Sequence, residues 1–473
     1  MFGIILTEAP ADWQILQQQE GFASVTLKGN YKVHPAALEV GVEYAIPQFR
    51  VMGEQDNMTV IPWTYMDITG EGKDFTGTFE TTFRIPVGGL YRIETSLETK
   101  STLPNITWLY RGDCVLHLGV GDLFVIAGQS NSAGYSRDFC ADPPSLMVHL
   151  YRNRSRWDLA CHPLNESTGI EGMANEEMGI PGVSPYLSFG KKYQELTGRP
   201  VGLVQTSLGG SPMRRWTPEK GELYLNMLEK MRQAGNRFAG VLWYQGCSDT
   251  DPGQSGLYAE RFRQYVTAVR RELGYEIPFF TMQLNRQING QHDECWGAVR
   301  EAQRRAALEI PGVYILSTTN LSLSDGIHNS APSNVVLGEK LAMQCNAVLN
   351  QQEEYEAPAL REASLTAPEE KEELKLEGVW LKLTYDHVKN ALLIFSGLGA
   401  DSGFTLKDQE GPVAVRSIRS NREDKNHIYL ELEREPEGRT LLSFAWQADP
   451  VKIPPVDETT YLPPVSCYEV EIL

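Results

Sequence analysis

Long hydrophobic runs are missing from this 473-residue sequence. Its longest apolar stretches, such as residues 123–127, are far shorter than the roughly 20 residues of a membrane-spanning helix. The short apolar stretch from Phe2 to Leu6 has no basic residue before it and no small-residue cleavage site after it, so no signal peptide is expected. We therefore expect a cytoplasmic protein that has no membrane partner.

Positive charge and paired cysteines are also scarce. The 43 Lys and Arg residues face 61 Asp and Glu residues, and the resulting net charge of −18 argues against nucleic acid as a partner. The seven cysteines are scattered and form no Cys-x-x-Cys pair, which favours free thiols in a reducing compartment over a disulfide framework or a zinc site. No other spacing typical of metal ligands occurs, so we expect no metal and no organic cofactor.

The remaining composition is that of an ordinary globular protein, with 41% hydrophobic and 22% charged residues. Residues 1–115 show period-two alternation, for example between positions 79 and 85, and predict an N-terminal β-sandwich-like domain. Residues 116–350 alternate short apolar segments with helical patterns and predict an α/β domain. Residues 351–473 begin with a charged, proline-punctuated stretch and return to β-patterning, which predicts a C-terminal β-rich module.

The central region carries the clearest periodic signals. Its apolar segments do not alternate, which indicates parallel strands buried on both faces of a doubly wound sheet. The predicted strands cover residues 123–127, 201–205, 240–244, 279–284 and 313–317, and the predicted helices cover residues 185–196, 256–273, 296–309 and 333–349. Sheets of this kind bind their ligands at the carboxyl ends of the strands.

Ser130 follows the first predicted strand of this sheet, in the run Gly128-Gln129-Ser130-Asn131-Ser132. A serine at this place has its hydroxyl exposed at the sheet edge, near backbone N–H groups that can stabilise an oxyanion. The run is not the Gly-x-Ser-x-Gly nucleophile elbow, because Ser132 stands where the last glycine would be. A serine after a strand is also a common helix cap, so Ser130 alone does not predict catalysis.

A candidate partner of this serine is His328, in the late run Asp325-Gly326-Ile327-His328. Three residues apart in a tight turn, Asp325 can orient the imidazole and stabilise its charged form. The other ring nitrogen is then free to take a proton from a serine. The alternative interpretation of this short motif is a solvated loop with a helix cap.

Two further strand ends supply candidate oxyanion donors. Gly209 and Gly210 follow the strand at 201–205, and glycine lets a backbone N–H approach a substrate oxygen closely. Gln245 follows the strand at 240–244, and its amide is a donor of the kind used in oxyanion holes. A glycine pair can also be a simple turn and a glutamine a solvated cap. Suitable groups at four strand or loop ends of one sheet make coincidence the weaker explanation.

These motifs resemble the SGNH-hydrolase branch that contains sialate O-acetylesterases and acetylxylan esterases, the carbohydrate esterase family six type. The matching blocks, in the family's order, are Gly128-Gln129-Ser130-Asn131, Ser207-Leu208-Gly209-Gly210-Ser211 with Trp216, Trp243-Tyr244-Gln245-Gly246, Arg300-Glu301-Ala302-Gln303 and Asp325-Gly326-Ile327-His328. The opening residues 12–17 and the terminal segments 444–446 and 462–464 also resemble sialate O-acetylesterases. The similarity therefore extends over essentially the whole chain.

The resemblance implies an SGNH-hydrolase, flavodoxin-like form of the doubly wound parallel sheet and a role for each motif residue. Ser130 is expected to be the nucleophile, His328 the general base and acid, and Asp325 the residue that orients the histidine. The expected oxyanion hole consists of the N–H of Ser130, the N–H of Gly209 or Gly210, and the amide of Gln245. The chain is then expected to hydrolyse acetyl esters on sugars without a cofactor.

Two positions depart from the family's pattern. Ser132 stands where the family often has Met, and Cys247 stands where it usually has Glu after the Gln-Gly pair. The acid role therefore rests on Asp325 alone. Cys247 as a nucleophile is a weaker alternative, because nothing in the sequence pairs it with a base.

The resemblance favours O-acetylated sialic acid as the substrate. Acetylated xylan or another neutral glycan is the alternative for an enzyme, and a non-catalytic carbohydrate-binding protein is the alternative of another class. The carboxylate of a sialic acid calls for a local cation, and arginine suits carboxylate recognition. The candidate substrate-binding residues are Gln129, Asn131, Arg214, Arg215 and Trp216, with Arg137, Arg152, Arg154, Arg156 and Trp157 in or near the long irregular segment 139–183. A loop of that length in a compact domain is usually functional.

Overall fold

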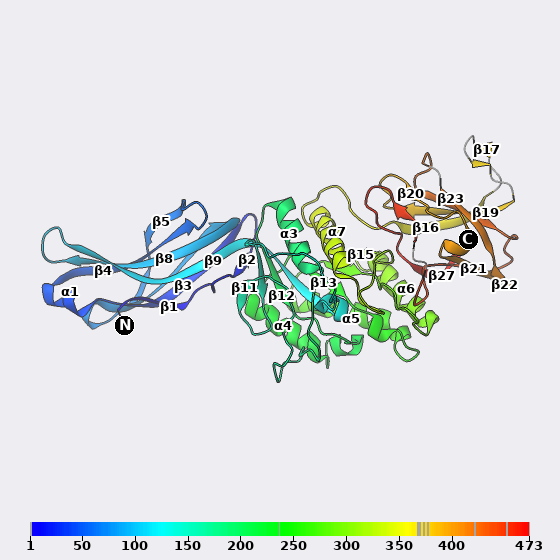
Figure 1. The fold of residues 1–473 in the computed structure, drawn as a ribbon. Coiled ribbons are helices and arrows are strands. Elements are labelled where there is room, and N and C mark those ends of the chain that lie inside the picture. The colour runs from blue at the N-terminus through cyan, green and yellow to red at the C-terminus, as the bar shows by residue number, and fades with distance from the viewer. Residues whose placement is uncertain are drawn as a thin grey trace.

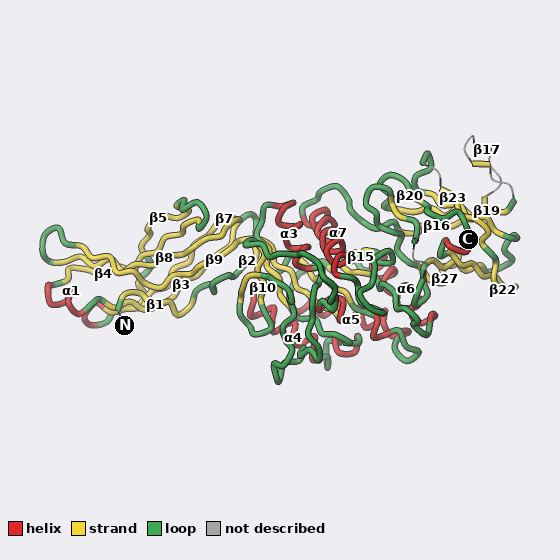
Figure 2. The backbone as a smooth tube through the Cα atoms, viewed as in Figure 1, coloured by secondary structure: helices red, strands yellow, loops and turns green. Residues whose placement is uncertain are grey.

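The computed structural model describes residues 2–235, 237–366, 370–371, 374–375, 378–420, 422–450 and 453–472. Its three parts follow one another along an elongated molecule, with a β-structure at each end and an α/β body between them (Figure 1). Figure 2 shows that the helices are concentrated in this middle body, apart from short ones such as α1 (Pro35–Val40). Among the described residues, no helix combines the length and the apolar character needed to cross a membrane.

The N-terminal part is built from two antiparallel β-sheets that share one core. One sheet has the order β1-β3-β7-β6, and the other joins β4, β5, β8 and the first half of β9. The bounds are β1 (Gly3–Glu8), β3 (Phe22–Lys32), β4 (Val42–Gly53), β5 (Thr59–Tyr65), β6 (Ile68–Glu71), the 3₁₀ turn η1 (Lys73–Phe75), β7 (Thr76–Pro86), β8 (Gly88–Ser101) and β9 (Thr107–Gly128). Val25 from the first sheet packs in the same core as Val51 and Ile93 from the second.

Strand β9 belongs to two parts of the molecule. Its first half pairs with β8, and residues 122–128 pair in parallel with strands of the central sheet. The short strand β2 (Ile15–Gln17) lies alongside the middle of β9, next to residues 119–121. The predicted change of region after residue 115 therefore falls inside one continuous strand, which runs directly from the N-terminal sheet into the central one.

The central domain is a doubly wound α/β structure, as predicted. Its sheet has the order β11-β10-β12-β9-β13-β14-β15, and every neighbouring pair is parallel except β10 and β11. The further strands are β10 (Val148–Tyr151), β11 (Trp157–Leu159), β12 (Val201–Gln205), β13 (Gly240–Tyr244), β14 (Phe279–Met282) and β15 (Val313–Leu316). The unbroken apolar runs in the sequence form strands here because helices bury both faces of the sheet.

Helices cover the two faces of this sheet (Figure 1). Their bounds are α3 (Tyr186–Thr197), α4 (Glu222–Ala234), α5 (Tyr258–Leu273), α6 (Asp293–Glu309) and α7 (Ala331–Leu349), with shorter turns at α2 (Ser130–Ala133), η2 (Met213–Trp216), η3 (Cys247–Asp249) and η4 (Ser255–Leu257). Met227 of α4 and Trp296 of α6 share one core with Val125 of β9. Phe189 of α3 shares the opposite core with Phe124, since consecutive strand residues point to opposite faces.

Three elements of this domain are missing from the sequence-based prediction. β10 and β11 lie within the segment predicted to be irregular, and α4 is not among the predicted helices. β10 has only four residues, all of them buried, which is too short to show a period. The segment 139–183 therefore contains the edge strands β10 and β11 of the sheet, with irregular chain before and after them.

The C-terminal module is formed mainly by two four-stranded antiparallel sheets around a common core that includes Leu383, Leu430 and Phe444. The first has the order β16-β19-β24-β23 and the second β22-β21-β25-β27. The bounds are β16 (Ala359–Thr366), β17 (Glu370–Lys371), β18 (Leu374–Lys375), β19 (Val379–Asp386), β20 (Leu392–Leu393), η5 (Gly399–Asp401), β21 (Phe404–Asp408), β22 (Gly411–Val413), β23 (Val415–Ser420), β24 (His427–Leu432), β25 (Thr440–Phe444), β26 (Val456–Asp457) and β27 (Cys467–Ile472).

Buried polar side chains of the central domain hold this module in place. The Gln283 amide donates to the carbonyl of Ser466 at 2.9 Å and accepts the Ser466 N–H at 2.8 Å. The Arg300 guanidinium donates to the carbonyl oxygens of Trp446, at 2.8 Å, and Gln447. Since these groups are buried, leaving any of them without a partner would cost free energy, and the junction is therefore specific.

Candidate active site

The residues predicted to carry chemistry all follow strands of the central parallel sheet. Ser130 comes after β9, the Gly209-Gly210 pair after β12, Gln245 after β13, and Asp325 and His328 after β15. Parallel strands end at the same edge of a sheet, so the topology brings these segments to one side of the domain.

Ser130 is the first residue of α2 and sits on a tight strand-to-helix turn. Gly128 in this turn has φ +131°, and a Cβ there would lie 2.3 Å from the carbonyl oxygen of Tyr244, so only glycine fits. Neither the hydroxyl nor the backbone N–H of Ser130 hydrogen-bonds to another residue within the described ranges. Both groups therefore remain available to a substrate.

Asp325 and His328 form a local hydrogen-bonded unit. Asp325 Oδ2 lies 2.6 Å from His328 Nδ1, and Asp325 Oδ1 accepts the backbone N–H groups of Ile327 and His328 at 2.8 Å each. Partial burial raises the pKa of Asp325, but the hydrogen bonds from the His328 ring and the two N–H groups outweigh burial and hold the pKa below its ordinary value. A charged Asp325 bound to Nδ1 leaves Nε2 of His328 as the nitrogen that can accept a proton.

Asn131 holds this histidine loop next to the serine. Its Oδ1 accepts the N–H of Asn329 at 2.9 Å and its Nδ2 donates to the carbonyl of Ile327 at 3.4 Å, so it grips the residues on both sides of His328. No direct hydrogen bond between Ser130 Oγ and His328 Nε2 is formed in the described chain, as is common in enzymes without substrate. These two contacts give Asn131 a structural task, and its role in substrate binding stays a prediction.

The predicted oxyanion donors behave differently from one another. The N–H of Gly209 donates to Glu177 Oε1 at 2.8 Å. The N–H of Gly210, a residue with φ +66°, has no partner among the residues that the structure describes. The sequence predicts the N–H of either Gly209 or Gly210 as an oxyanion donor. In the structure Gly210 is the one whose N–H is free, in addition to that of Ser130.

Gln245 does not provide an oxyanion donor in this structure. Its side chain is completely buried, and its Nε2 donates to the carbonyl of Ser211 at 3.1 Å and to Asp249 Oδ2 at 2.6 Å. Both amide hydrogens are thus used inside the protein, and the prediction is wrong for this residue. Gln129 also has a structural task, because its Oε1 accepts the N–H groups of Gly246 and Ser248 at 2.9 and 3.2 Å.

The two tryptophans among the candidate substrate-binding residues lie in the core instead. Trp216 is fully buried, donates its Nε1–H to Ser211 Oγ at 3.2 Å, and packs edge-on against Trp243. Trp157 is buried against Tyr151 at the sheet edge. The prediction that Trp216 binds substrate is therefore wrong, because the ring has no accessible face.

Three of the candidate arginines are neutralised within the protein. The pairs are Arg152 with Asp158 at 3.3 Å and Glu166 at 2.9 Å, Arg156 with Asp158 at 3.4 Å, and Arg215 with Glu222. Arg152 is also buried and donates to the carbonyl of Leu159, so it stabilises the loop. The predicted contact between Arg215 and a substrate carboxylate would have to compete with Glu222.

Arg137, Arg154 and Arg214 are exposed, and within the described chain no carboxylate forms a salt bridge with them. Arg137 differs from the other two in its surroundings. Its guanidinium carbon lies 5.6 Å from the centroid of the Tyr135 ring, and that ring stacks on the His328 imidazole with 5.3 Å between centroids. Arg137 is thus an uncompensated cation close to the catalytic candidates.

Two residues near the site escape the sequence analysis. Glu177 lies in the long segment 139–183 and Tyr135 follows α2, and the two are joined by a 2.6 Å hydrogen bond. For Glu177 the signal in the sequence is the length of the segment. Tyr135 lies outside that segment, and no local motif marks either residue.

Cys247 is poorly suited to be a nucleophile. Burial raises the pKa of its thiol to about 12, so the reactive thiolate is not formed at neutral pH. It faces Arg300, which is fully buried, and burial lowers the pKa of that guanidinium to about 10. Carbonyl oxygens of Leu284 and Asn285, rather than a carboxylate, bind this cation on the central-domain side.

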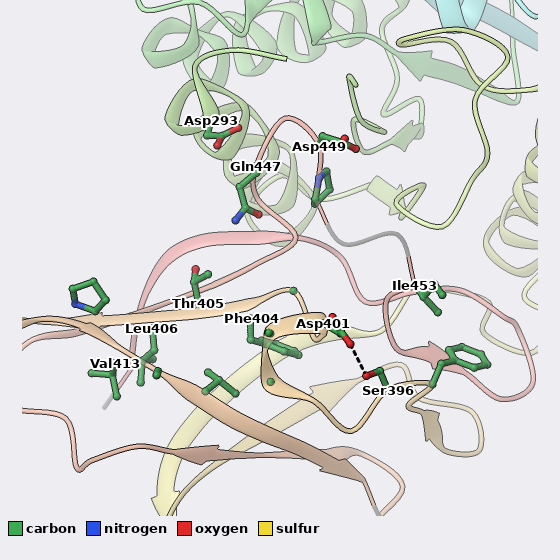
Figure 3. Close-up of a pocket in the computed structure, with 18 of the residues that line it drawn as sticks. Asp293, Ser396, Asp401, Phe404, Thr405, Leu406, Val413, Gln447, Asp449 and Ile453 are labelled. Carbon is green, nitrogen blue, oxygen red and sulfur yellow. Dashed lines mark hydrogen bonds between the residues drawn. The ribbon is translucent and has the colours of Figure 1, made fainter. Parts of the chain in front are cut away.

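A cavity of about 1130 Å³ lies between α6 and the C-terminal module. Figure 3 shows Asp293 of the central domain and, from the module, Asp449, Phe404, Asp401 and Ser396. None of the catalytic candidates lines it.

One wall of this cavity is nevertheless connected to the catalytic loop. Asn289 and Gly290 line the cavity, and the preceding residue, Ile288, donates its N–H to the carbonyl of Gly326 at 2.8 Å.

Glu354, Glu356 and His387 form a group whose ligand atoms lie within 4.8 Å of one another, close enough to hold a metal ion. All three belong to the segment after α7 and to the C-terminal module, whereas Ser130 and His328 belong to the central domain. The group therefore adds nothing to the chemistry of the candidate site.

A serine after an early strand of a doubly wound sheet, with an Asp-x-x-His loop after the last strand, is the arrangement typical of SGNH-type esterases. Residues 120–347 match the family model described as carbohydrate esterase, sialic acid-specific acetylesterase. The central domain is therefore similar to that carbohydrate esterase family.

Two known proteins illustrate the similarity. The chain is 28% identical over 247 residues to a probable carbohydrate esterase from Arabidopsis thaliana, which covers 46% of this chain and 88% of the relative. The crystal structure of a carbohydrate acetylesterase from Xanthomonas citri superposes with a TM-score of 0.61 and 18% identity, and covers 98% of this chain and 99% of that one. The second comparison shows that the fold is shared along the whole chain, flanking β-regions included.

Proposed function

We propose that this carbohydrate esterase is a serine-dependent sialate O-acetylesterase, which removes acetyl groups from O-acetylated sialic acids. The observation that carries the catalytic part is the Asp325–His328 unit, which Asn131 holds beside an unpaired Ser130 hydroxyl. A base oriented by a carboxylate next to a serine is the arrangement that acyl transfer requires.

The first half of the reaction forms an acyl-enzyme. Ser130 Oγ attacks the acetyl carbonyl carbon while His328 Nε2 accepts the hydroxyl proton, and Asp325 stabilises the imidazolium that results. The carbonyl oxygen becomes an oxyanion that accepts hydrogen bonds from the N–H groups of Ser130 and Gly210. When the carbonyl re-forms, the bond to the sugar oxygen breaks, and that oxygen takes the proton from His328.

The second half releases acetate. His328 Nε2 removes a proton from a water molecule, whose oxygen attacks the acyl carbonyl carbon. The bond to Ser130 Oγ then breaks, and Oγ recovers the proton from His328.

The preference for sialic acid is supported by charge and by the family. An acidic protein with a net charge of −18 repels a carboxylate unless a local cation attracts it. Arg137 is such a cation, since it has no carboxylate partner in the described chain and lies against the tyrosine that stacks on His328. The matching family model is itself described as sialic acid-specific.

The test measures acetate release by the wild type and by Ser130→Ala from 9-O-acetylated sialic acid, acetylated xylo-oligosaccharides and an activated acetyl ester. We expect the wild type to act on the sialic acid and Ser130→Ala to be inactive. Release from xylo-oligosaccharides alone would instead identify a neutral-glycan esterase. No release from any of the three would contradict the esterase assignment and favour a binding protein.

The same assay with Arg137→Met tests the carboxylate contact. We expect KM for acetylated sialic acid to rise about tenfold, the value of one charge-assisted hydrogen bond, with no change for a neutral acetyl ester. Arg154→Met, in which another exposed arginine of the same region is lost, is the control and should leave both constants unchanged. Equal effects of Arg137→Met on the charged and the neutral substrate would contradict this role.

A further inference from the structure

Glu177 is a buried carboxylate in an unusual environment. Its side chain belongs to a residue that is 3% exposed, and no lysine or arginine in the described ranges forms a salt bridge with it. Burial raises its pKa, against the opposing effects of its hydrogen bonds and of the charge on Arg215. Burying a charge without an ion pair costs free energy. A buried carboxylate at this position is therefore a candidate for a functional role.

Three hydrogen-bond donors converge on this carboxylate. Oε1 accepts the backbone N–H of Gly209 and the Nδ2–H of Asn165, each at 2.8 Å, and Oε2 accepts the hydroxyl of Tyr135 at 2.6 Å. All three groups donate, so the ionised form of Glu177 satisfies every contact. A proton or an N–H at Oε1 would oppose the two N–H donors, whereas one that faces Tyr135 would require its hydroxyl to turn and accept.

The Gly209 contact sets the conformation of the proposed oxyanion loop. A Cβ on Gly209 would lie 2.8 Å from Glu177 Oε2 and 3.0 Å from the Tyr135 ring, so the loop is packed directly against both side chains. Gly210 follows with φ +66° and a free N–H. Glu177 thus holds the residue immediately before the proposed donor.

The Tyr135 contact extends the same support to the nucleophile and the base. The Tyr135 N–H donates to the carbonyl of Ser130 at 3.2 Å. Its ring stacks on His328 with 5.3 Å between centroids and 28° between planes. Tyr135 therefore contacts the two residues that exchange the proton in the proposed reaction.

Glu177 itself is fixed from behind by buried amides. Asn165 Oδ1 accepts the Nδ2–H of Asn153 at 2.7 Å, and Asn165 Nδ2 also donates to the carbonyl of Ser207 at 3.3 Å. The N–H of Glu177 donates to Ser167 Oγ at 3.1 Å. Rigid support of this kind is what a catalytic constellation needs, because small displacements of reacting groups reduce rates strongly.

We propose that Glu177 and Tyr135 are positioning residues that fix the Gly209-Gly210 loop and the His328 ring relative to Ser130. This inference rests on the proposed esterase function of the same site. It assigns the long segment 139–183 a role in catalysis, which is to deliver Glu177 to the point where three separate chain segments meet.

The experiment compares Glu177→Gln, Tyr135→Phe and the double variant. Glu177→Gln keeps the shape but removes the charge, and its N–H group either opposes the Gly209 and Asn165 donors or forces the Tyr135 hydroxyl to reverse. We expect kcat to fall about 10- to 100-fold, below the roughly 10²–10³ of a lost oxyanion donor, with little change in KM. Tyr135→Phe keeps the ring on His328 and loses only the hydroxyl, so a smaller fall in kcat is expected. The double variant should be no worse than Glu177→Gln, because both changes break one unit.

Glu176→Gln is the matched control, because Glu176 is the neighbouring glutamate and its side chain takes no part in this network; it should behave as the wild type. A second readout is the rate at which a fluorophosphonate phosphonylates Ser130, which depends on the nucleophile, the base and the oxyanion donors but not on sugar binding. We expect this rate to fall in parallel with kcat. The melting temperature of each variant is measured alongside.

The outcomes separate the two proposals. A wild type that releases no acetate from any ester contradicts the proposed function. An active wild type with Glu177→Gln and Tyr135→Phe variants that lose only thermal stability, with kcat and phosphonylation unchanged, contradicts the positioning role. If Glu177→Gln does not fold, Tyr135→Phe decides, since it removes no buried charge: unchanged kcat and phosphonylation would overturn the proposal.

Discussion

Two turns at the same edge of the central sheet carry similar residues and do opposite things. The turn at 324–329, after β15, pairs Asp325 with His328 Nδ1 and leaves Nε2 without a partner among the described residues. The turn at 245–249, after β13, pairs Asp249 with Gln245 and leaves no donor free. A polar side chain at the end of a parallel strand is therefore not by that position alone a candidate for catalysis. It must also keep a donor or an acceptor that no other protein group uses.

The two aspartates show the physical origin of the difference. Asp325 is half-exposed, and its hydrogen bonds hold its pKa below the ordinary value. Asp249 is fully buried, and burial raises its pKa although Gln245 and the N–H of Met213 hydrogen-bond to it. The first carboxylate can support a charge that forms during a reaction, and the second is part of the core.

The strongest test of the comparison removes the reactive nitrogen. His328→Ala should lower kcat by at least about 10³-fold, because Ser130 then has no base, while the melting temperature changes little for a partly exposed side chain. Acetate release and phosphonylation of Ser130 are measured together. An activity within tenfold of the wild type would mean that another group is the base.

Asp325→Asn should have the next largest effect. The asparagine amide carries no negative charge and cannot stabilise an imidazolium as the carboxylate does. We therefore expect kcat to fall about 10²- to 10⁴-fold. Because the folded-state pKa of Asp325 is lowered, its charge contributes stability above the unfolded-state pKa, and this contribution is lost as the pH falls through the folded-state pKa. Urea unfolding of both proteins between pH 3 and 7 should show a stability difference that shrinks with acidification; a constant difference would contradict the assignment.

Gln245→Ala should affect stability rather than turnover. The substitution leaves the buried Asp249 without its closest side-chain partner, and we expect the free energy of unfolding to fall by about 1–3 kcal/mol. Turnover at a temperature well below the melting point should stay within about threefold of the wild type, in contrast to the roughly 10²–10³ expected on loss of an oxyanion donor. A loss of the latter size with unchanged stability would restore Gln245 to the oxyanion hole.

Cys247→Ala should have the smallest effect on turnover. Its thiol is held protonated by burial, so kcat should remain within about twofold of the wild type and iodoacetamide should not inactivate the native enzyme. Inactivation by iodoacetamide that the substitution abolishes would identify Cys247 as a reactive group.

Sequence reasoning succeeds where a pattern is local. The Asp325–His328 contact joins residues three positions apart and forms within one turn. The strands of the central sheet are recognisable because a strand buried on both faces must be apolar throughout. β10 escapes because four residues show no period, and Trp216 is misread because an aromatic residue near a glycine pair looks the same in sequence whether its ring is buried or open.

What the sequence by itself determined is the fold class, the strand ends and the short-range contact between Asp325 and His328, since all of these depend on neighbours along the chain. Only the tertiary structure decided which polar groups stay free, because their partners are distant in sequence. The Gly209 N–H is taken by Glu177, 32 positions away, and the histidine loop is held by Asn131, 198 positions from Asn329. Each such hydrogen bond uses a polar group that the sequence alone shows as available. Folding therefore leaves only a few of the candidate groups free to contact a substrate.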